Sequence, residues 1–261
     1  MARGFTRLEP SFHERIWGTT TLAPWFPDPE RRIGEVWFSG GVNASLLAKL
    51  IFTSANLSVQ VHPADDFARE HENSRGKTEM WHVLEAEPGA VVAIGFRDRI
   101  TREQFEAALA ECRVENLLQW VPARAGDTFL IPAGTVHAIG AGLTLCEIQQ
   151  NSDVTYRLYD YGRPRELHLD KGLAVSHLEP YDGKVDLPIR CAHFNAGVLL
   201  ISDNEVLDAG PGRERMWMVL EGSGALNGQA YRKGELWRLD DDCPPIRVEP
   251  AESTRFLAAS T

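Results

Sequence analysis

The sequence predicts a mainly β protein, a barrel or sandwich of short strands interrupted by a few short helices. Two observations support this class: alternating apolar and polar residues recur along most of the chain, and turn-forming residues separate these runs. A third is that few segments show helical spacing. With 261 residues, 43% of them hydrophobic, the chain is long enough for one large or two small packed domains.

The strands predicted in the first part of the chain are short and close together. They cover residues 32–39, 49–53, 58–62, 79–85, 90–96, 128–131, 144–150 and 157–160. A helix is predicted to begin at the capping-box pattern Thr101-Arg-Glu-Gln104 and to present Phe105 and Leu109 on one face. We expect further helical segments over residues 114–120 and 65–71.

A second β-rich stretch follows a change of composition after about Glu179, where Pro, Asp and Gly become frequent. It covers residues 196–256 and loosely repeats the order of the first half, which indicates an internal duplication. We therefore expect two units, residues 1–180 and 181–261. Because no histidine follows His193, the second unit cannot supply an equivalent histidine-based site and is expected to bury surface or brace the first.

Charge and composition narrow the classes of partner. The formal net charge is -10 and no basic block is present, so a nucleic-acid partner is not expected. The N-terminus has no apolar signal core and no stretch approaches eighteen apolar residues, so we expect a cytoplasmic protein with no membrane partner. The cysteines lack CxxC spacing, which favours reduced thiols. They are Cys112, Cys146, Cys191 and Cys243.

Three polar segments between Ser58 and His137 together resemble a mononuclear metal site. Gln60 and His62 are two apart on a predicted strand and therefore share one face, directed into the barrel. Glu79 opens the next strand, and His137 follows a Pro-x-Gly turn that can return its strand to the same centre. Two imidazoles, a carboxylate and an amide oxygen suit a borderline divalent cation such as zinc.

The remaining histidines are interpreted as ordinary surface or core residues. His82 is the one rival, since it lies three residues after Glu79. Two residues at this spacing share a face on a helix but not on a strand, and a strand is predicted here.

The motifs resemble those of a known family. Gly126-x5-Pro132-x-Gly134-x2-His137 is similar to the second motif of the cupin superfamily, and Gln60-x-His62 with Glu79 is similar to the first. More narrowly, three segments resemble the type I mannose-6-phosphate isomerases, over a region from about Ile16 to Lys171. They are Leu57-Ser-Val-Gln-Val-His-Pro-Ala-Asp-Asp66, Gly76-Lys-Thr-Glu-Met-Trp81 and Asn151-Ser-Asp-Val-Thr-Tyr-Arg157.

The resemblance implies a cupin-type jelly roll with a degenerate second cupin-like unit at the C-terminus. It implies one zinc ion per chain, Lys77 and Arg157 lining the substrate pocket, and acidic residues at Glu147 and Asp153. The implied zinc ligands are Gln60, His62, Glu79 and His137. The chain lacks the long helical insertion of larger members, and the run from Arg157 to Arg163 resembles the compact bacterial form.

The reaction implied is the interconversion of mannose 6-phosphate and fructose 6-phosphate through an enediolate. Arg157 offers a permanent cation for an oxyanion or a phosphate, and Lys77 offers a proton or a phosphate contact. The polar odd-numbered positions from residue 147 to 157 would line a lumen on an extended strand, so Glu147 and Asp153 both remain candidates for the general base. Cations available for the phosphate are Lys77, Arg157, Arg163 and Arg165.

Two other functions fit parts of the pattern. Two histidines and one carboxylate also describe the iron site of a cupin dioxygenase, although Gln60 as a fourth donor disfavours it. A non-catalytic cupin that binds sugar phosphates is the second alternative, and the cationic and acidic residues beside the site disfavour it.

Overall fold

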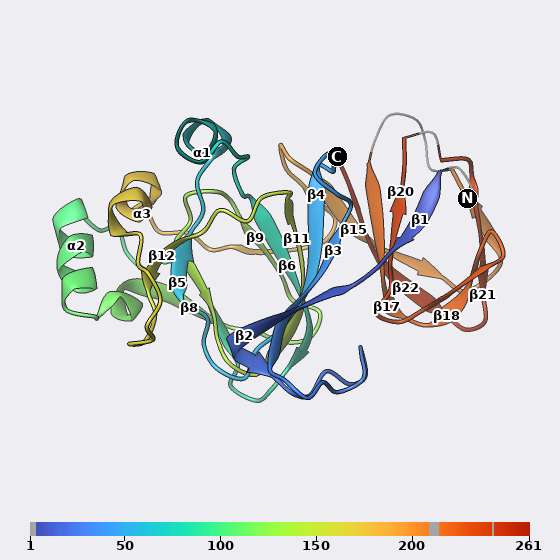
Figure 1. The fold of residues 1–261 in the computed structure, drawn as a ribbon, viewed down its shortest axis with the longest axis horizontal. Helices are drawn as coiled ribbons and strands as arrows, with labels where there is room; N and C mark the ends of the chain where they lie inside the picture. The colour runs from blue at the N-terminus through green and yellow to red at the C-terminus, as the bar shows by residue number, and fades with distance from the viewer. Residues whose placement is uncertain (1–3, 209–213, 242) are drawn as a thin grey trace.

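The protein consists of two β-sandwiches that lie side by side (Figure 1). The structure is a computed structural model that describes residues 4–208, 214–241 and 243–261. In the first sandwich, a seven-stranded sheet of order β13-β9-β6-β11-β4-β3-β2 packs on a five-stranded sheet of order β12-β5-β10-β7-β8. The seven strands are β2 Ser11–Thr19, β3 Ile33–Ser39, β4 Leu46–Phe52, β6 Glu79–Ala86, β9 Thr128–Ile131, β11 Leu143–Gln150 and β13 Lys184–Val185. The five are β5 Val59–Val61, β7 Val91–Phe96, β8 Leu118–Pro122, β10 His137–Ile139 and β12 Tyr156–Tyr159.

The second sandwich contains most of the C-terminal third. A six-stranded sheet of order β1-β20-β17-β22-β15-β14 accompanies a four-stranded sheet of order β16-β21-β18-β19. The six strands are β1 Phe5–Leu8, β14 Ile189–Arg190, β15 Asn195–Ile201, β17 Arg215–Glu221, β20 Leu236–Leu239 and β22 Thr254–Ser260. The four are β16 Glu205–Leu207, β18 Ser223–Leu226, β19 Gln229–Arg232 and β21 Ile246–Pro250. The mainly β class is confirmed.

The helices are α1 Asp65–Glu72, α2 Arg102–Ala110 and α3 Leu169–Val175, with a 3-10 turn at Val114–Leu117. Helices α2 and α3 lie on the outer side of the five-stranded sheet, and α1 lies near one end of its strands (Figure 1). Phe105 of α2 packs in one apolar cluster with Val59 and Val61. The strand β5 therefore directs its valines to the helices and its polar residues to the opposite face, as its alternation predicts.

Two local expectations were wrong. The helix expected over residues 114–120 ends as a 3-10 turn at Leu117, and Leu118–Pro122 forms strand β8 on the edge of the five-stranded sheet. The polar odd-numbered positions from residue 147 to 157 do not line a lumen on one extended strand, because β11 and β12 belong to different sheets and residues 151–155 join them.

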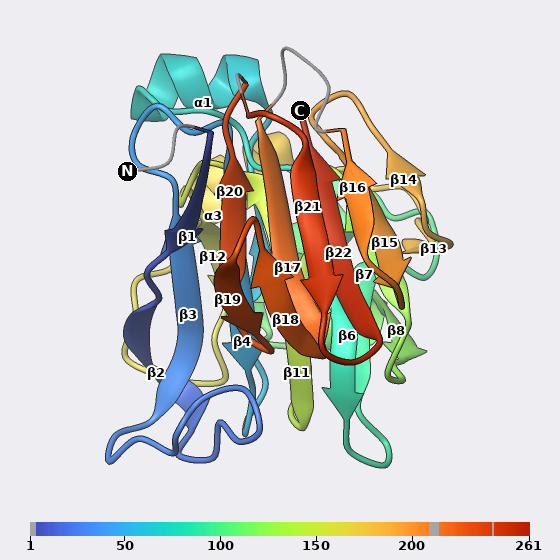
Figure 2. The same ribbon diagram turned by 90° about the vertical axis from the view of Figure 1, so that its right-hand side faces the viewer.

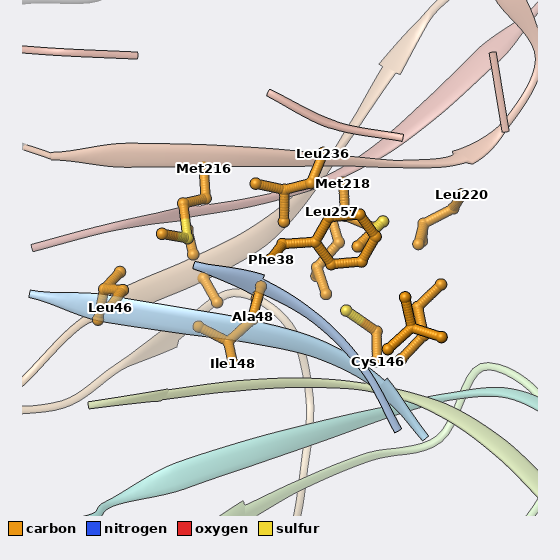
Figure 3. Close-up of a cluster of buried hydrophobic side chains, with 14 of the residues drawn as sticks. Phe38, Leu46, Ala48, Cys146, Ile148, Met216, Met218, Leu220, Leu236 and Leu257 are labelled. Atoms are coloured by element: carbon orange, nitrogen blue, oxygen red, sulfur yellow. The ribbon is translucent and has the colours of Figure 1, made fainter. Parts of the chain in front are cut away.

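The two sandwiches share an apolar core. Figure 3 shows side chains from β3, β4 and β11 facing side chains from β17, β20 and β22. Among them, Ile148 and Cys146 are completely buried, as are Met218 and Leu236 on the other side. One face of β11 is covered by this core, and the other faces the interior between the two sheets of the first sandwich. Both faces are therefore buried, and β11 does not alternate strictly between apolar and polar residues.

Strand pairing crosses the expected division near residue 180 at two places. Strand β1 pairs with β20 in the second sandwich, and β13 pairs with β9 in the first. Figure 2 shows the second sandwich lying across the seven-stranded sheet. The assignment of residues 1–180 and 181–261 to two separate units stays a prediction.

Across the described ranges, the helices are all too short or too polar to cross a membrane.

Candidate metal centre

The four predicted metal-binding side chains come from both sheets of the first sandwich. Gln60 lies on β5, His62 directly follows it, and His137 begins β10, all on the five-stranded sheet. His137 pairs with Gln60, and Gln60 pairs with Arg157 on the next strand, so three of the predicted site residues form one row. Glu79 begins β6 on the opposite sheet, and its carboxylate reaches the two imidazoles.

Backbone carbonyls orient both imidazole rings. His62 Nδ1 lies 2.8 Å from the oxygen of Val154, and His137 Nδ1 lies 2.9 Å from the oxygen of Thr135. A carbonyl accepts only from a protonated nitrogen, so both rings are held as tautomers whose Nε2 carries a lone pair and no hydrogen. Burial lowers the pKa of both rings, that of His137 to about 4, which keeps them neutral and able to act as ligands.

Glu79 lies between the two rings and is fully buried. Its Oε2 is 3.4 Å from His62 Nε2 and its Oε1 is 3.4 Å from His137 Nε2. Neither oxygen makes a hydrogen bond of good geometry within the described part of the chain. Burial, together with the nearby Glu147 carboxylate, raises the pKa of Glu79 to about 7. A buried carboxylate in this situation needs a positive charge beside it.

Lys77 supplies that charge in this structure. Its Nζ lies 2.8 Å from Glu79 Oε2 and 3.0 Å from His62 Nε2, although only 3% of the residue is exposed. Burial alone would lower the pKa of Lys77, but the carboxylates of Glu79 and Glu147 raise it above its ordinary value. Two of the four proposed donors, His62 and Glu79, are therefore in contact with a cation in the form of an ammonium group.

The Gln60 amide completes the cluster. Its Nε2 is 3.3 Å from His137 Nε2, and its Oε1 accepts a hydrogen bond from Ser58 at 3.2 Å. A half-turn about the last side-chain bond exchanges the amide nitrogen and oxygen, which have nearly the same shape. The amide oxygen would then face the same centre as the imidazole nitrogens.

Glu147 lies deeper along the seven-stranded sheet in a row of paired residues. It is paired with Lys49 on one neighbouring strand and with Trp81 on the other. Its Oε1 is 3.1 Å from Lys49 Nζ, and its Oε2 accepts a hydrogen bond from Trp81 Nε1 at 3.0 Å. Burial would raise the pKa of Glu147, but Lys49 and Lys77 outweigh that effect and hold it well below the ordinary value.

A cavity of about 580 Å³ opens beside this cluster. The cavity is lined by Gln60, Lys77, Glu147, Asp153 and Arg157. Asp153 is exposed, and among the described residues no side chain donates to its carboxylate. Arg157 donates to the carbonyl oxygen of Glu166 at 2.8 Å, and its Nε is buried without a hydrogen-bond partner.

The predicted phosphate cations separate into two groups. Arg165 lines the cavity, and its guanidinium is paired with Asp160 at 2.6 Å. Arg163 is directed to Asp160 and to the carbonyl oxygen of Asn56, and it does not line this cavity.

Several residues that line the cavity were missed by the sequence prediction. Among them are Arg15, Glu35, Trp37 and Lys49. Lys49 had a signal that could have revealed it, because it is a charged residue in the middle of the apolar run Leu46–Phe52. Its Nζ lies over the Trp37 ring, 4.6 Å from the ring centroid. Arg15, Glu35 and Trp37 had no distinguishing sequence pattern.

The turn before His137 depends on Gly134. This residue has a φ of +87°, and a Cβ there would lie 2.6 Å from the His177 ring. Only glycine adopts this conformation at low cost and leaves room for the imidazole. His82, the rival ligand, is on the opposite face of β6, where its Nδ1 lies 2.9 Å from Thr128 Oγ1.

The fold and the site together define a cupin-type β protein with a candidate metal centre between its sheets. No family model matches the chain. The chain is 32% identical to the mannose-6-phosphate isomerase ManA of Bacillus subtilis, over 86% of this chain and 88% of that one. It is 42% identical to a mannose-6-phosphate isomerase of Streptococcus mutans, over 64% of this chain and 66% of that one.

Solved structures agree with the sequence relatives. The crystal structure of the mannose 6-phosphate isomerase from Bacillus subtilis superposes with a TM-score of 0.88 at 26% identity, covering 98% of this chain and 99% of that one. A phosphomannose isomerase from Salmonella typhimurium shares the fold at 15% identity, with a TM-score of 0.80 over 98% of this chain and 99% of that one. The chain belongs to the mannose-6-phosphate isomerase family.

Proposed function

We propose that the chain is an aldose–ketose isomerase that interconverts mannose 6-phosphate and fructose 6-phosphate through an enediolate. Family membership supports the reaction and the substrate. The observation from the chain itself is the neutral His62 and His137 pair around the buried Glu79, with a cavity next to it lined by Arg157 and acidic residues. Moving a proton between neighbouring carbons requires a base, an electrophile for the developing oxyanion and an anchor for the phosphate, and this cavity offers residues for each role.

Gln60, His62, Glu79 and His137 would hold one zinc ion. The donor set suits zinc, and the ammonium of Lys77 beside Glu79 indicates that the centre favours a cation. When bound, the zinc ion supplies a fixed positive charge that polarises a substrate oxygen. Lys77 would then turn toward the cavity, which it already lines, and bind or protonate a substrate oxygen.

Arg157 is the proposed electrophile of the protein itself. Its guanidinium is charged at every relevant pH, and its unpartnered Nε provides a donor for an oxyanion or a phosphate oxygen. Arg165 and Arg15 line the same cavity and add positive charge for phosphate binding. With a net charge of -10 the whole molecule does not attract an anionic substrate, so these local cations would provide the selectivity.

Asp153 is a better candidate for the general base than Glu147. The Glu147 carboxylate is already engaged by Lys49 and Trp81, and its lowered pKa makes it a weak base. Asp153 is exposed to the cavity and available to a bound sugar. Glu147 would instead hold Lys49 in place.

The chain's partner would be a small sugar phosphate, and its location would be the cytoplasm. The four cysteines support that location, since the described structure has all of them as thiols rather than disulfides. A dioxygenase or a non-catalytic binding protein fits less well, because the sequence relatives are named isomerases.

A coupled assay with mannose 6-phosphate, together with elemental analysis of protein purified without added metal, tests the proposal. We expect turnover and about one zinc per chain in the wild type. His137→Ala should lose both, because it removes one of two imidazole donors. His71→Ala, on the exposed side of α1, is the matched control and should keep both. An active His137→Ala variant that binds no metal would refute the assignment.

A further inference from the structure

Among the described residues, none from the second sandwich belongs to the candidate metal centre, yet a continuous series of polar contacts connects this sandwich to His62. We propose that Glu214 and Arg238 of the second sandwich, acting through Asn151, position His62 and thereby set the affinity of the site for its metal. This inference rests on the proposed metal centre. It assigns a role to Asn151, the first residue of the motif Asn151-Ser-Asp-Val-Thr-Tyr-Arg157.

The first contact is between the second sandwich and residues 40–45, the loop that joins β3 to β4. Arg238 Nη1 donates to the carbonyl oxygen of Gly40 at 2.7 Å. Glu214 Oε2 accepts from the backbone N–H of Ser45 at 2.5 Å. Both ends of the loop are therefore attached to the second sandwich by charge-assisted hydrogen bonds, which are stronger than neutral ones.

These two bonds hold the ends of the loop, while Arg75 Nη1 donates to the carbonyl oxygen of Ala44 within it at 2.9 Å. The loop borders a cavity of about 820 Å³, and its Val42 is 93% exposed. A loop with few apolar contacts takes its position mainly from its hydrogen bonds. Losing the contacts from Glu214 or Arg238 would therefore let residues 40–45 move.

Asn151 connects the loop to the segment that contacts the metal centre. Its Nδ2 donates to the carbonyl oxygens of Gly41 and Ala44, at 3.1 and 2.9 Å, and its N–H donates to that of Ser45 at 2.9 Å. One asparagine thus makes three hydrogen bonds to this loop. Asn151 is the first residue of the segment 151–155, which leads from β11 to β12.

The same segment orients the metal-binding histidine. Ser152 Oγ donates to the carbonyl oxygen of Arg75, two residues before Lys77, at 2.8 Å. Val154 then presents its carbonyl oxygen to His62 Nδ1 at 2.8 Å. Because that contact fixes the tautomer and the direction of the ring, a shift of residues 151–155 would misplace His62 Nε2. Removing such outer contacts typically weakens metal binding about 10- to 100-fold.

Metal affinity of the full chain, measured by competition with a chromophoric chelator for Zn²⁺, tests the inference. Asn151→Ala should raise the dissociation constant about tenfold, and Arg238→Met about threefold, because the second acts one step further away. Arg238→Lys, which keeps a donor for Gly40, should restore most of the affinity. At saturating Zn²⁺ the isomerase activity of these variants should return toward the wild-type value.

The matched control is Arg247→Met on strand β21. Arg247 pairs with Glu249 at 3.2 Å in the four-stranded sheet and has no place in the series of contacts. Its affinity for Zn²⁺ should equal that of the wild type. The visible spectrum of the Co²⁺-loaded chain provides a second readout, since its bands report ligand geometry and should change in Asn151→Ala but not in Arg247→Met.

The outcomes distinguish the proposed metal centre from the proposed role of Glu214 and Arg238. If the wild type itself binds neither Zn²⁺ nor Co²⁺, the metal centre is wrong. If the wild type binds and Arg238→Met folds, binds with the same affinity and shows the same Co²⁺ spectrum, only the present inference is overturned. Equal losses in Arg238→Met and Arg247→Met would also overturn it, because they would reflect general destabilisation. Should Asn151→Ala fail to fold, the Arg238 variants decide alone.

Discussion

Lys49 and Glu147 form a buried ion pair in the wall of the cavity beside the candidate metal centre. Both are almost completely buried and lie 3.1 Å apart, with the Trp37 ring on the other side of the ammonium. Removing one charge leaves the other buried without a partner, which is strongly destabilising, whereas removing both is often tolerated. Single and double variants of this pair can therefore distinguish effects on the stability of the cavity wall from effects on catalysis.

Glu147→Gln should lower the free energy of unfolding by about 3 kcal/mol, since it leaves Lys49 uncompensated. The double variant Glu147→Gln with Lys49→Met should recover most of that loss, as measured by urea denaturation. Asp153→Asn should keep the wild-type stability and lose turnover about 10³-fold if Asp153 is the base. Wild-type turnover in Asp153→Asn would remove Asp153 from that role.

Arg157 depends on shape as well as charge. Arg157→Lys keeps the charge but loses the planar fork that donates to Glu166 and to the cavity together. We expect kcat/KM for mannose 6-phosphate to fall about 10²-fold, the usual cost of losing one well-placed oxyanion donor. Arg163→Lys is the control, because Arg163 is bonded to Asp160 away from the cavity, and its kinetics should change little. Equal effects in the two variants would argue against a role for Arg157.

At the scale of single elements, sequence patterns located eight strands of the first sandwich within a few residues and missed β2, β8, β10 and β13. The predicted segments 128–131 and 79–85 correspond to β9 and β6, because alternation and bounding turns are local properties. The segment 114–120 failed because a single 3-10 turn resembles the start of a helix, and pairing with β7 converts the following residues to a strand. That pairing partner is distant in sequence and cannot be seen in a local window.

Helix α2 shows that a capping pattern can be read reliably. Thr101 accepts from the N–H of Gln104 at 3.2 Å, and the Gln104 side chain accepts from the N–H of Thr101 at 2.8 Å. Thr101→Ala should reduce the free energy of unfolding by about 1 kcal/mol in urea denaturation. Glu106→Ala, which breaks an exposed pair with Arg102, should cost less than about 0.5 kcal/mol. If Thr101→Ala were as stable as Glu106→Ala, the cap would contribute no more to the stability of α2 than an exposed ion pair does.

At the scale of the whole molecule, the junction between the two sandwiches contains a buried histidine. His82 lines a small cavity with Arg255, Lys233, Glu85 and Glu221. Burial, assisted by the nearby Arg255, lowers the pKa of His82 to about 4 from an ordinary value of 6.5. Between these values the unfolded chain takes up a proton at His82 that the folded chain excludes, so stability is lost as the pH falls.

The free energy that this residue contributes should therefore fall by about 2 kcal/mol between pH 7 and pH 5. Urea denaturation of the wild type and His82→Gln at both pH values measures it, and the difference between them should shrink at the lower pH. If the free energy of unfolding fell by the same amount in the wild type and in His82→Gln between pH 7 and pH 5, the junction would tolerate a charged imidazole.

The sequence by itself determined the fold class, the segments that carry the polar donors, and the turn at Gly134, because alternation, spacing and glycine backbone freedom are local. Only the tertiary structure decided that Glu79 crosses from one sheet to meet His62 and His137 on the other. It also decided that Lys49 pairs with Glu147, nearly one hundred residues away, and that the second sandwich covers the outer face of β11. The reason is that strand register and sheet packing set which distant side chains face one another, and neither is recorded in a local pattern.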